Sequence, residues 1–174
     1  MDDLERRGLE DRLRKSHDAW DRTFNAISDT ILIIDKNHTI VKANKAALDL
    51  LQKTYDQIVG MKCFEVMHKS NSPWHLCPLE KTNADHFAHV EEVNDPAIGF
   101  PLLVTTSPIF DENNEYAGVV HVAKDISERK KIEDELHKRI EALERFQRIT
   151  VDRELKMKEL KAQIVQLESQ LKQR

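Results

Sequence analysis

The sequence is poor in glycine, cysteine and aromatic residues, and each shortage argues against a class of function. Four glycines in 174 residues form no glycine-rich loop of the kind that cradles phosphate groups. The two cysteines, Cys63 and Cys77, make no disulfide framework and suit a reducing compartment. Aromatic residues are only 6% of the chain, and the sequence has no basic patch that contains them. It therefore lacks the basic, aromatic-containing surface that a nucleic-acid partner would need.

Long apolar runs are also missing. No run approaches the ~20 residues that span a bilayer, and the charged N-terminus does not resemble a signal peptide. We therefore expect a soluble, cytoplasmic protein that does not enter a membrane. The net charge is -4, with acidic residues in excess in the middle of the chain and basic residues in excess in the tail.

The pattern of apolar residues divides the chain into three parts, residues 1–28, 29–127 and 128–174. Apolar residues of the first part recur near heptad spacing, at Leu9, Leu13, Trp20 and Ile27. This spacing predicts an amphipathic helix from Leu9 onward. The length of the chain suits one domain with extensions at both ends.

The middle part opens with two β-branched runs, at residues 31–35 and 39–43, which a short turn joins into a predicted hairpin. Asn44 follows, and its side chain can accept an amide from the first turn of a helix over residues 45–51. A further short helix is predicted at residues 55–59, where a glycine ends the pattern.

Three more strands complete the middle part. Two strand-like runs lie at residues 89–93 and 100–106, and a third run of β-branched residues ends at Asp125. Pro101 and Pro108 cannot donate to a sheet ladder, so we expect each at a strand end, an edge or a bulge.

The last of these strands runs directly into the third part. Ser127 is suited to cap a helix, and Asp125 and Glu128 place negative charge where the helix dipole is positive. Residues 125–129 read Asp-Ile-Ser-Glu-Arg, which resembles the Asp-Ile-Thr-Glu-Arg signature that closes many PAS sensor domains. We expect Asp125, Ile126 and Ser127 to transmit movement from the sheet to the helix.

Other segments support the resemblance, which covers residues 20–130. Asn44-Lys45-Ala46-Ala47 and Ile58-Val59-Gly60-Met61 are similar to the opening of a PAS domain. The resemblance implies an α+β fold, with a PAS-like five-stranded antiparallel sheet and short helices. The N-terminal amphipathic helix and a long C-terminal coiled-coil helix would flank this domain.

The third part carries a sustained heptad pattern. One seam position holds Leu136, Leu143, Thr150, Met157, Ile164 and Leu171, and the other holds Ile132, Phe146, Leu160 and Leu167. A helix over residues 128–174 would be roughly 70 Å long, too long to bury its stripe against so small a domain. A parallel homodimeric coiled coil is the simplest partner arrangement, and Arg139 and Arg153 should loosen it near Thr150.

PAS-like folds wrap a sheet around short helices and leave room for a small ligand. The apolar residues predicted to line such a pocket are Ile33, Val41, Phe64, Met67, Trp74, Phe87, Val104 and Val122, with Thr106 and His121 as polar groups. Ordinary core packing explains each of these residues equally well.

The residues between the second and third strands also suggest a metal site. They resemble a PAS subgroup with a Cys, a His and a Pro-Cys-x-x-Cys-Pro run, except that Trp74 replaces the first cysteine of that run. Thiolates and imidazoles bind zinc or iron, and the four candidate ligands are Cys63, His68, His75 and Cys77. Their spacing does not require a metal, and the alternative is that both thiols are small core residues.

Haem is a second cofactor hypothesis, because some PAS oxygen sensors hold haem through a histidine before the third strand. His86 and His89 lie near that position, although the Cys-x-x-Cys-His motif for covalent attachment is absent. A redox pair of Cys63 and Cys77 is a third hypothesis, but the sequence shows no base near either thiol. His137 does not resemble a kinase phosphoacceptor and is predicted to be an exposed helix residue.

These observations predict a non-enzymatic PAS sensor and dimerisation module of signal transduction. It would act on a signalling effector or output domain, and the sequence demands no cofactor. The alternatives are a metal- or haem-binding redox or gas sensor, and the input fragment of a histidine kinase or cyclase whose catalytic part lies outside this chain.

Overall fold

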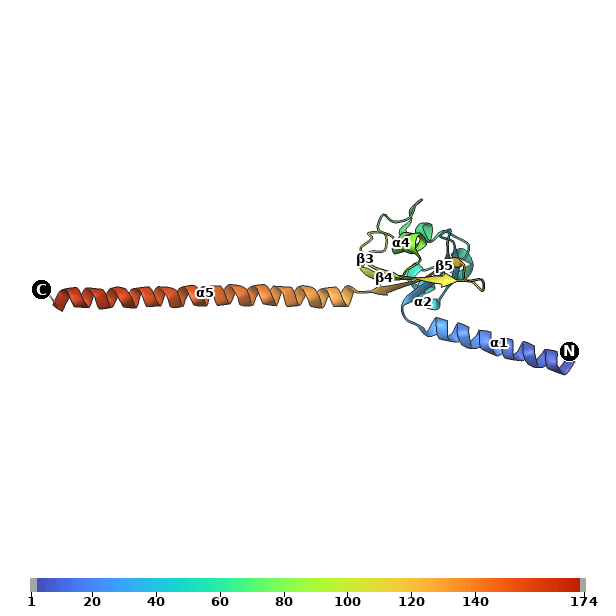
Figure 1. Cartoon of the computed structure of the whole chain (residues 1–174), viewed down its shortest axis with the longest axis horizontal. Coiled ribbons are helices and arrows are strands. Elements are labelled where there is room, and N and C mark those ends of the chain that lie inside the picture. The colour runs from blue at the N-terminus through green and yellow to red at the C-terminus, as the bar shows by residue number, and fades with distance from the viewer. Residues whose placement is uncertain (1–2, 173–174) are drawn as a thin grey trace. The chain divides into compact units, whose positions relative to one another are not determined.

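The structure, a computed structural model, describes the backbone of residues 3–172 and the side chains of residues 5–164. Contacts divide the chain into two compact units, Met1–Ser127 and Glu128–Arg174. The elements, in chain order (Figure 1), are α1 Asp3–Ala26, β1 Thr30–Asp35, β2 Ile40–Ala43, α2 Lys45–Leu51, the 3-10 helix η1 Tyr55–Gln57, α3 Cys63–His68, α4 Pro78–Asp85, β3 His89–Val93, β4 Leu102–Phe110, β5 Tyr116–Asp125 and α5 Ser127–Lys172.

One antiparallel sheet contains the five described strands in the order β2-β1-β5-β4-β3. The first and last strands of the chain therefore lie side by side at its centre, where Leu32 of β1 is opposite His121 of β5. The predicted five-stranded antiparallel sheet, with helices before, within and after it, is confirmed.

The fourth strand is longer than the sequence predicts, because β4 continues to Phe110. Its pairing with β3 covers Leu102 to Thr106, whereas its pairing with β5 continues through Pro108, which is opposite Val119. Within the described sheet, β4 thus pairs only with β5 at Pro108. The missing amide of this proline therefore costs no β3 ladder bond.

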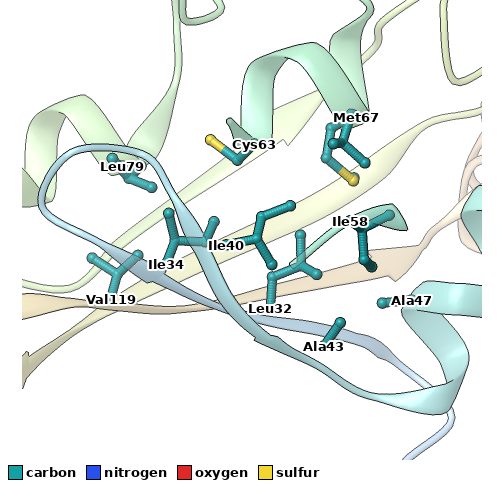
Figure 2. Close-up of a cluster of buried hydrophobic side chains, with 11 residues drawn as sticks. Leu32, Ile34, Ile40, Ala43, Ala47, Ile58, Cys63, Met67, Leu79 and Val119 are labelled. Carbon is teal, nitrogen blue, oxygen red and sulfur yellow. The ribbon is translucent and has the colours of Figure 1, made fainter. Parts of the chain in front are cut away.

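Side chains alternate between the two faces of the sheet, as the pleat requires. The inner face carries buried residues from three neighbouring strands, which include Ile34, Val104 and Val119. Figure 2 shows the main core cluster, in which residues of β1, β2 and β5 meet the helices and the segment around Ile58. The buried members of this cluster are Leu32, Ile34, Ile40, Ala43, Ala47, Ile58, Cys63, Val66, Met67, Leu79 and Val119.

Asn44 joins the end of β2 to the chain before β1. Its side-chain oxygen accepts the amides of Ile31 and Ala47, both at 3.0 Å. Its side-chain nitrogen donates to the carbonyls of Ile27 at 3.1 Å and Asp29 at 2.9 Å. Asn44 is fully buried, so this one residue both caps α2, as predicted, and fixes the start of the sheet.

The outer edge of β2 is covered by the segment that precedes α3. The Gly60 amide donates to the Ile40 carbonyl at 2.8 Å, and the Ile40 amide donates to the Met61 carbonyl at 2.9 Å. Thr39 and Lys62 add an isolated antiparallel bridge. This edge of the sheet therefore has hydrogen-bond partners from outside the named strands.

The N-terminal helix α1 contacts the sheet domain near its C-terminal end. The Trp20 ring stacks on Phe24 with centroids 4.7 Å apart, and the Lys42 ammonium lies 4.1 Å from the Trp20 ring centroid. Asn25 accepts the Lys45 amide at 2.8 Å. Further toward the N-terminus, Leu13 is 73% exposed, so the apolar stripe of this helix is not covered there.

The C-terminal helix α5 has 46 residues, and its side chains from residue 131 to residue 164 are all exposed. The large apolar residues of the predicted seam include Leu143, which is 62% exposed, and Phe146, which is 69% exposed. The predicted seam residues Leu167 and Leu171 lie outside the described side chains. Within residues 3–172, no helix combines the length and apolar character needed to cross a membrane.

Candidate functional site

Two buried threonines connect α4 to β4 in the interior of the sheet domain. The Thr106 hydroxyl donates to the carbonyl of Pro78 at 3.1 Å, and the hydroxyl oxygens of Thr82 and Thr106 are 2.7 Å apart. A hydroxyl has one proton, so Thr106 uses its proton on Pro78 and Thr82 must donate to Thr106. The position of α4 on the sheet thus depends on an ordered chain of two hydrogen bonds.

His121 lies opposite Thr106 on the neighbouring strand. Its ring is buried, and its Nδ1 atom has no hydrogen-bond partner among the described residues. Burial, together with the charge of His68, lowers the pKa of His121 from 6.5 to about 4. A neutral imidazole with one unsatisfied nitrogen is therefore available on the inner face of the sheet.

A second imidazole pairs with a buried carboxylate nearby. His68 Nδ1 is 2.6 Å from the Asp95 carboxylate, which also accepts the Ala97 amide at 2.9 Å. Burial raises the pKa of Asp95, but the Ala97 amide and the His68 ring outweigh it and leave the pKa below its ordinary value. Trp74 stacks on the His68 ring at a centroid distance of 5.8 Å.

A third cluster combines a thiol, an imidazole and a carboxylate. The Cys63 sulfur is 3.9 Å from His38 Nδ1, and His38 Nε2 is 2.6 Å from the Glu80 carboxylate. Burial, assisted by the charge of Cys77, raises the pKa of the Cys63 thiol to about 12. His38 has a φ of 67°, a conformation that only a few per cent of non-glycine residues adopt.

Cys77 immediately precedes α4 and packs against the same core cluster as Cys63. Burial raises the pKa of its thiol, although the backbone amides of Glu80 and Leu79 in the first turn of α4 act in the opposite direction. Both cysteines are free thiols. Cys77 is only partly buried, whereas Cys63 is 7% exposed.

The residues predicted to line a pocket fall into two groups. Met67, Val104, Thr106 and His121 are buried in the interior. Phe64 and Trp74 are partly buried beside it, against His38 and His68 respectively.

The remaining predicted liners lie elsewhere. Phe87 is 71% exposed and Val41 is 48% exposed. Val122 follows His121 directly in β5, so the two side chains point to opposite faces of the sheet. Ile33, which is opposite Val120, also belongs to the outer face. A ligand pocket lined by the interior subset stays a prediction.

The four residues predicted as metal ligands lie in different surroundings. Cys63 and Cys77 belong to one core cluster, whereas His68 pairs with Asp95. His75 is exposed and lies against Trp74, with ring centroids 4.7 Å apart. Within the described part of the chain, no three His, Cys, Asp or Glu side chains group in a way that could hold a metal ion.

The two histidines considered for haem have protein partners. The exposed His86 ring stacks on Tyr116 at a centroid distance of 4.3 Å. The Nε2 atom of His89 is 2.9 Å from the Asp85 carboxylate, four residues before it. Release of His89 from Asp85 would be needed before that nitrogen could bind iron.

The segment between β5 and α5 is a single residue, Ile126, which is 4% exposed. Its amide donates to the Pro101 carbonyl at 3.1 Å. The Asp125 carboxylate accepts the Ser127 amide in an Asx turn. The Ile126 and Ser127 amides are therefore both held by hydrogen bonds within the domain.

A family model described as a PAS domain matches residues 28–128. The chain belongs to the PAS domain family. PAS domains are typically regulatory sensor modules and not catalysts. A search of curated proteins finds no match to this chain.

Solved structures that are similar to this chain have low sequence identity to it. The PAS domain of an HTR-like protein from Haloarcula marismortui is 14% identical and has a TM-score of 0.50, with 69% of this chain and 99% of that one covered. An RNA-binding Light-Oxygen-Voltage receptor is 17% identical with a TM-score of 0.55, over 70% of this chain and 36% of the receptor. The PAS domain of a Colwellia psychrerythraea protein is 17% identical with a TM-score of 0.48, over 67% and 98% of the two chains.

Four polar residues that pair with other side chains of the PAS domain were not predicted from the sequence. His38 contacts Cys63, Glu80 pairs with His38, Asp95 pairs with His68, and Thr82 supports Thr106. Each partner lies more than twenty residues away from the residue it supports, so no local motif announces the pair.

Proposed function

We propose that this PAS chain is a sensor and dimerisation module of signal transduction. A ligand- or redox-dependent change in the PAS interior would pass through residues 125–127 to α5. There α5 would pair with the same helix of a second copy and act on an effector or output domain.

The observation that carries the proposal is the join between β5 and α5. β5 pairs with both β1 and β4 at the centre of the sheet, and its inner face carries His121. One buried residue separates this strand from the helix, and both neighbours of that residue take part in the Asx turn. A change in the position of β5 would therefore move the first residues of α5 as well, because no loop separates the two elements.

The exposed apolar stripe of α5 supports a helical partner. Helices in proteins gain most of their stability from packing an apolar face. The large apolar seam residues of α5 whose side chains are described are all exposed. The heptad spacing from Leu136 to Ile164 is that of a coiled coil. A second copy of this chain offers the same stripe, which makes a parallel homodimer the simplest occupant.

Sedimentation equilibrium of the full chain tests the dimer. We expect a dimer for the native protein and a monomer for Leu160→Glu, which places charge in the seam. Lys158→Glu is the matched control, because it adds the same side chain to an exposed non-seam position. A monomeric native protein whose far-ultraviolet spectrum lacks the helical content of α5 would contradict the proposal.

Photo-crosslinking tests the arrangement and the coupling. A crosslinking side chain placed at residue 143 or residue 160 should capture the same position of the second copy, as a parallel, in-register pair requires. Asp125→Ala should change the yield at these positions, whereas Lys124→Ala should not. Identical patterns in both variants and the native protein would show that the join does not control α5.

The metal- or haem-binding sensor is the second proposal, and the contact of the Cys63 sulfur with the His38 ring is the observation that favours it. Metal analysis and an absorption spectrum of the purified protein separate it from a sensor without a metal. The input-fragment alternative concerns an output domain outside this chain and leaves the chemistry of these residues unchanged.

A further inference from the structure

Four polar side chains form a connected cluster between the β1–β2 turn, α3 and α4. Cys63 contacts His38, His38 pairs with Glu80, and Glu80 lies one helical turn after Cys77. The His38 carbonyl also accepts the Cys63 amide at 2.8 Å. His38 is therefore held against Cys63 through both its backbone and its ring.

The two thiols lie in the same region of the core. Cys63 is a buried member of the main core cluster, and Cys77 packs against that cluster. After burial, the charge of Cys77 is the second largest cause of the raised pKa of Cys63. In Figure 2 the Cys63 sulfur points to the side of the cluster where Leu79 of α4 lies, two residues after Cys77.

Glu80 determines which nitrogen of the His38 imidazole carries the proton. A carboxylate can only accept hydrogen bonds, so the Nε2 atom that faces Glu80 carries a proton. In the neutral ring, Nδ1 then has the free lone pair, and this is the atom that faces the Cys63 sulfur. The arrangement of thiol, imidazole and carboxylate is that of a nucleophile with an oriented base.

We propose that Cys63 and Cys77 are a thiol-oxidation site, at which a low-molecular-weight disulfide converts them into an intramolecular disulfide with His38 as the base. This chemistry is the redox input of the proposed function, and its regulatory consequence rests on that function. The sequence offered no base for these thiols, and the structure supplies one from a residue that lies 25 positions away from Cys63.

The reaction proceeds in two thiol–disulfide exchanges. The partly exposed Cys77 first attacks the small disulfide, gives up its proton to solvent, forms a mixed disulfide and releases one small thiol. Cys63 then transfers its proton to His38 Nδ1, and its sulfur attacks the Cys77 sulfur and breaks the mixed disulfide. The departing small thiolate takes the proton from His38 and leaves as the second small thiol. The two protein thiols lose two electrons and two protons in total, and the small disulfide is reduced to two thiols.

Burial limits the reaction of these thiols to conditions in which a base can accept the proton. The thiolate is the reactive form of cysteine, and burial disfavours it at both positions. Cys63 therefore reacts only when its proton has an acceptor in place, and the acceptor is His38. The bond would be formed where Cys77 precedes Pro78, whose carbonyl holds the Thr106 hydroxyl of β4. Movement of Cys77 toward Cys63 would thus act on the α4–β4 contact.

The test incubates the full chain in glutathione redox buffers, followed by acid quench, alkylation under denaturing conditions and peptide mass spectrometry. We expect a peptide that links Cys63 to Cys77, two hydrogen masses lighter than the dithiol. Cys63→Ser should stop at the glutathione adduct of Cys77. Two alkylated thiols in every buffer, or disulfides only between chains, would overturn the proposal.

A second measurement isolates the base. His38→Asn removes the imidazole, while asparagine tolerates the left-handed backbone of this position. We expect it to slow closure of the mixed disulfide by about 100-fold or more, because a general base usually contributes 10²–10⁴-fold. His86→Asn is the matched control, because His86 also has a left-handed backbone but lies outside the cluster. Equal closure rates for the two variants would overturn the role of His38.

Failure of the disulfide proposal can be distinguished from failure of the proposed function. An intramolecular disulfide in a protein that does not dimerise would sustain this inference and contradict the proposed signalling helix. A stable dimer whose thiols never join would do the reverse. Stoichiometric zinc that blocks alkylation of both thiols in the purified protein would also overturn the disulfide proposal.

Discussion

Asp125 and Ser127 are joined across Ile126 by a hydrogen bond of 2.7 Å, from the Ser127 amide to the Asp125 carboxylate. The bond fixes the first amide of α5, which has no partner within the helix. The carboxylate also lies at the positive end of the helix dipole. One side chain from the last residue of the sheet thus helps to determine where the helix begins.

Asp125→Ala should lower the free energy of unfolding by about 1 kcal/mol, the usual cost of losing a side-chain cap. Asp125→Asn should lose less, because its side-chain oxygen can still accept the Ser127 amide. Urea unfolding followed by circular dichroism measures both. The exposed neighbour Lys124 gives the control variant Lys124→Ala, and an equal loss for all three variants would speak against a specific role of the cap.

His121 should make stability depend on pH in mildly acidic solution. Its pKa is about 4 in the folded protein, below the ordinary value of 6.5, so between these values the unfolded chain binds a proton that the folded chain refuses. The free energy of unfolding should therefore fall as the pH falls through this window, by up to about 1.4 kcal/mol per pH unit. Urea unfolding at a series of pH values measures the slope.

His121→Gln should flatten that slope, since glutamine does not titrate. The carboxylates that titrate near pH 4 affect both proteins, so the informative quantity is the difference between the variant and the native protein. His137→Gln, at an exposed position of α5, should leave the slope unchanged. A variant His121→Gln with the native slope would mean that His121 is accessible to protons in the folded state.

Asn44 should tolerate neither Ala nor Asp. Asn44→Ala removes four hydrogen bonds from a buried position and should cost about 3 kcal/mol of unfolding free energy. Asn44→Asp retains the acceptor but turns an oxygen toward the carbonyls of Ile27 and Asp29, so a similar or larger loss is expected at neutral pH. Asn113→Asp, at an exposed turn, should change stability little. Thermal and urea unfolding measure these losses. If Asn44→Asp changed the free energy of unfolding as little as Asn113→Asp, the predicted role of the Asn44 side-chain nitrogen would be wrong.

Gly118 should be intolerant of a side chain because it lies in β5 directly against the backbone of β1. A Cβ atom at this position would lie 2.1 Å from the Ile34 carbonyl oxygen, a distance at which backbone must move. Gly118→Ala should therefore cost about 3 kcal/mol or prevent folding. Gly8→Ala in α1 meets nothing within 4 Å and should instead stabilise its helix by about 0.5–1 kcal/mol.

The elements of this fold follow from local patterns, whereas the polar interior does not. The β-branched runs and the Asn44 cap predicted the hairpin and α2, because period and capping are local properties. The strand period also contains information that the pocket prediction overlooked. His121 and Val122 are successive residues of one strand, so they could not both line an interior.

Pairs distant in the sequence set the limit of prediction. His38 reaches Glu80 across 42 residues, and Asp95 reaches His68 across 27. Nothing local marks a lone histidine or carboxylate as one member of such a pair. Phe87 shows the opposite error, since an aromatic residue was expected in the interior but lies 71% exposed before β3.

The borders of the sheet have a consequence for self-association. Pairing from residues 60–62 already occupies the free side of β2, and β3 is a strand of only five residues that carries Glu91 and Glu92. Short, charged or covered borders resist the addition of a foreign strand, which is the usual first step toward fibrils. At high concentration this protein should therefore not form cross-β aggregates through its sheet edges. Contacts between copies should instead be made by the surfaces of its helices.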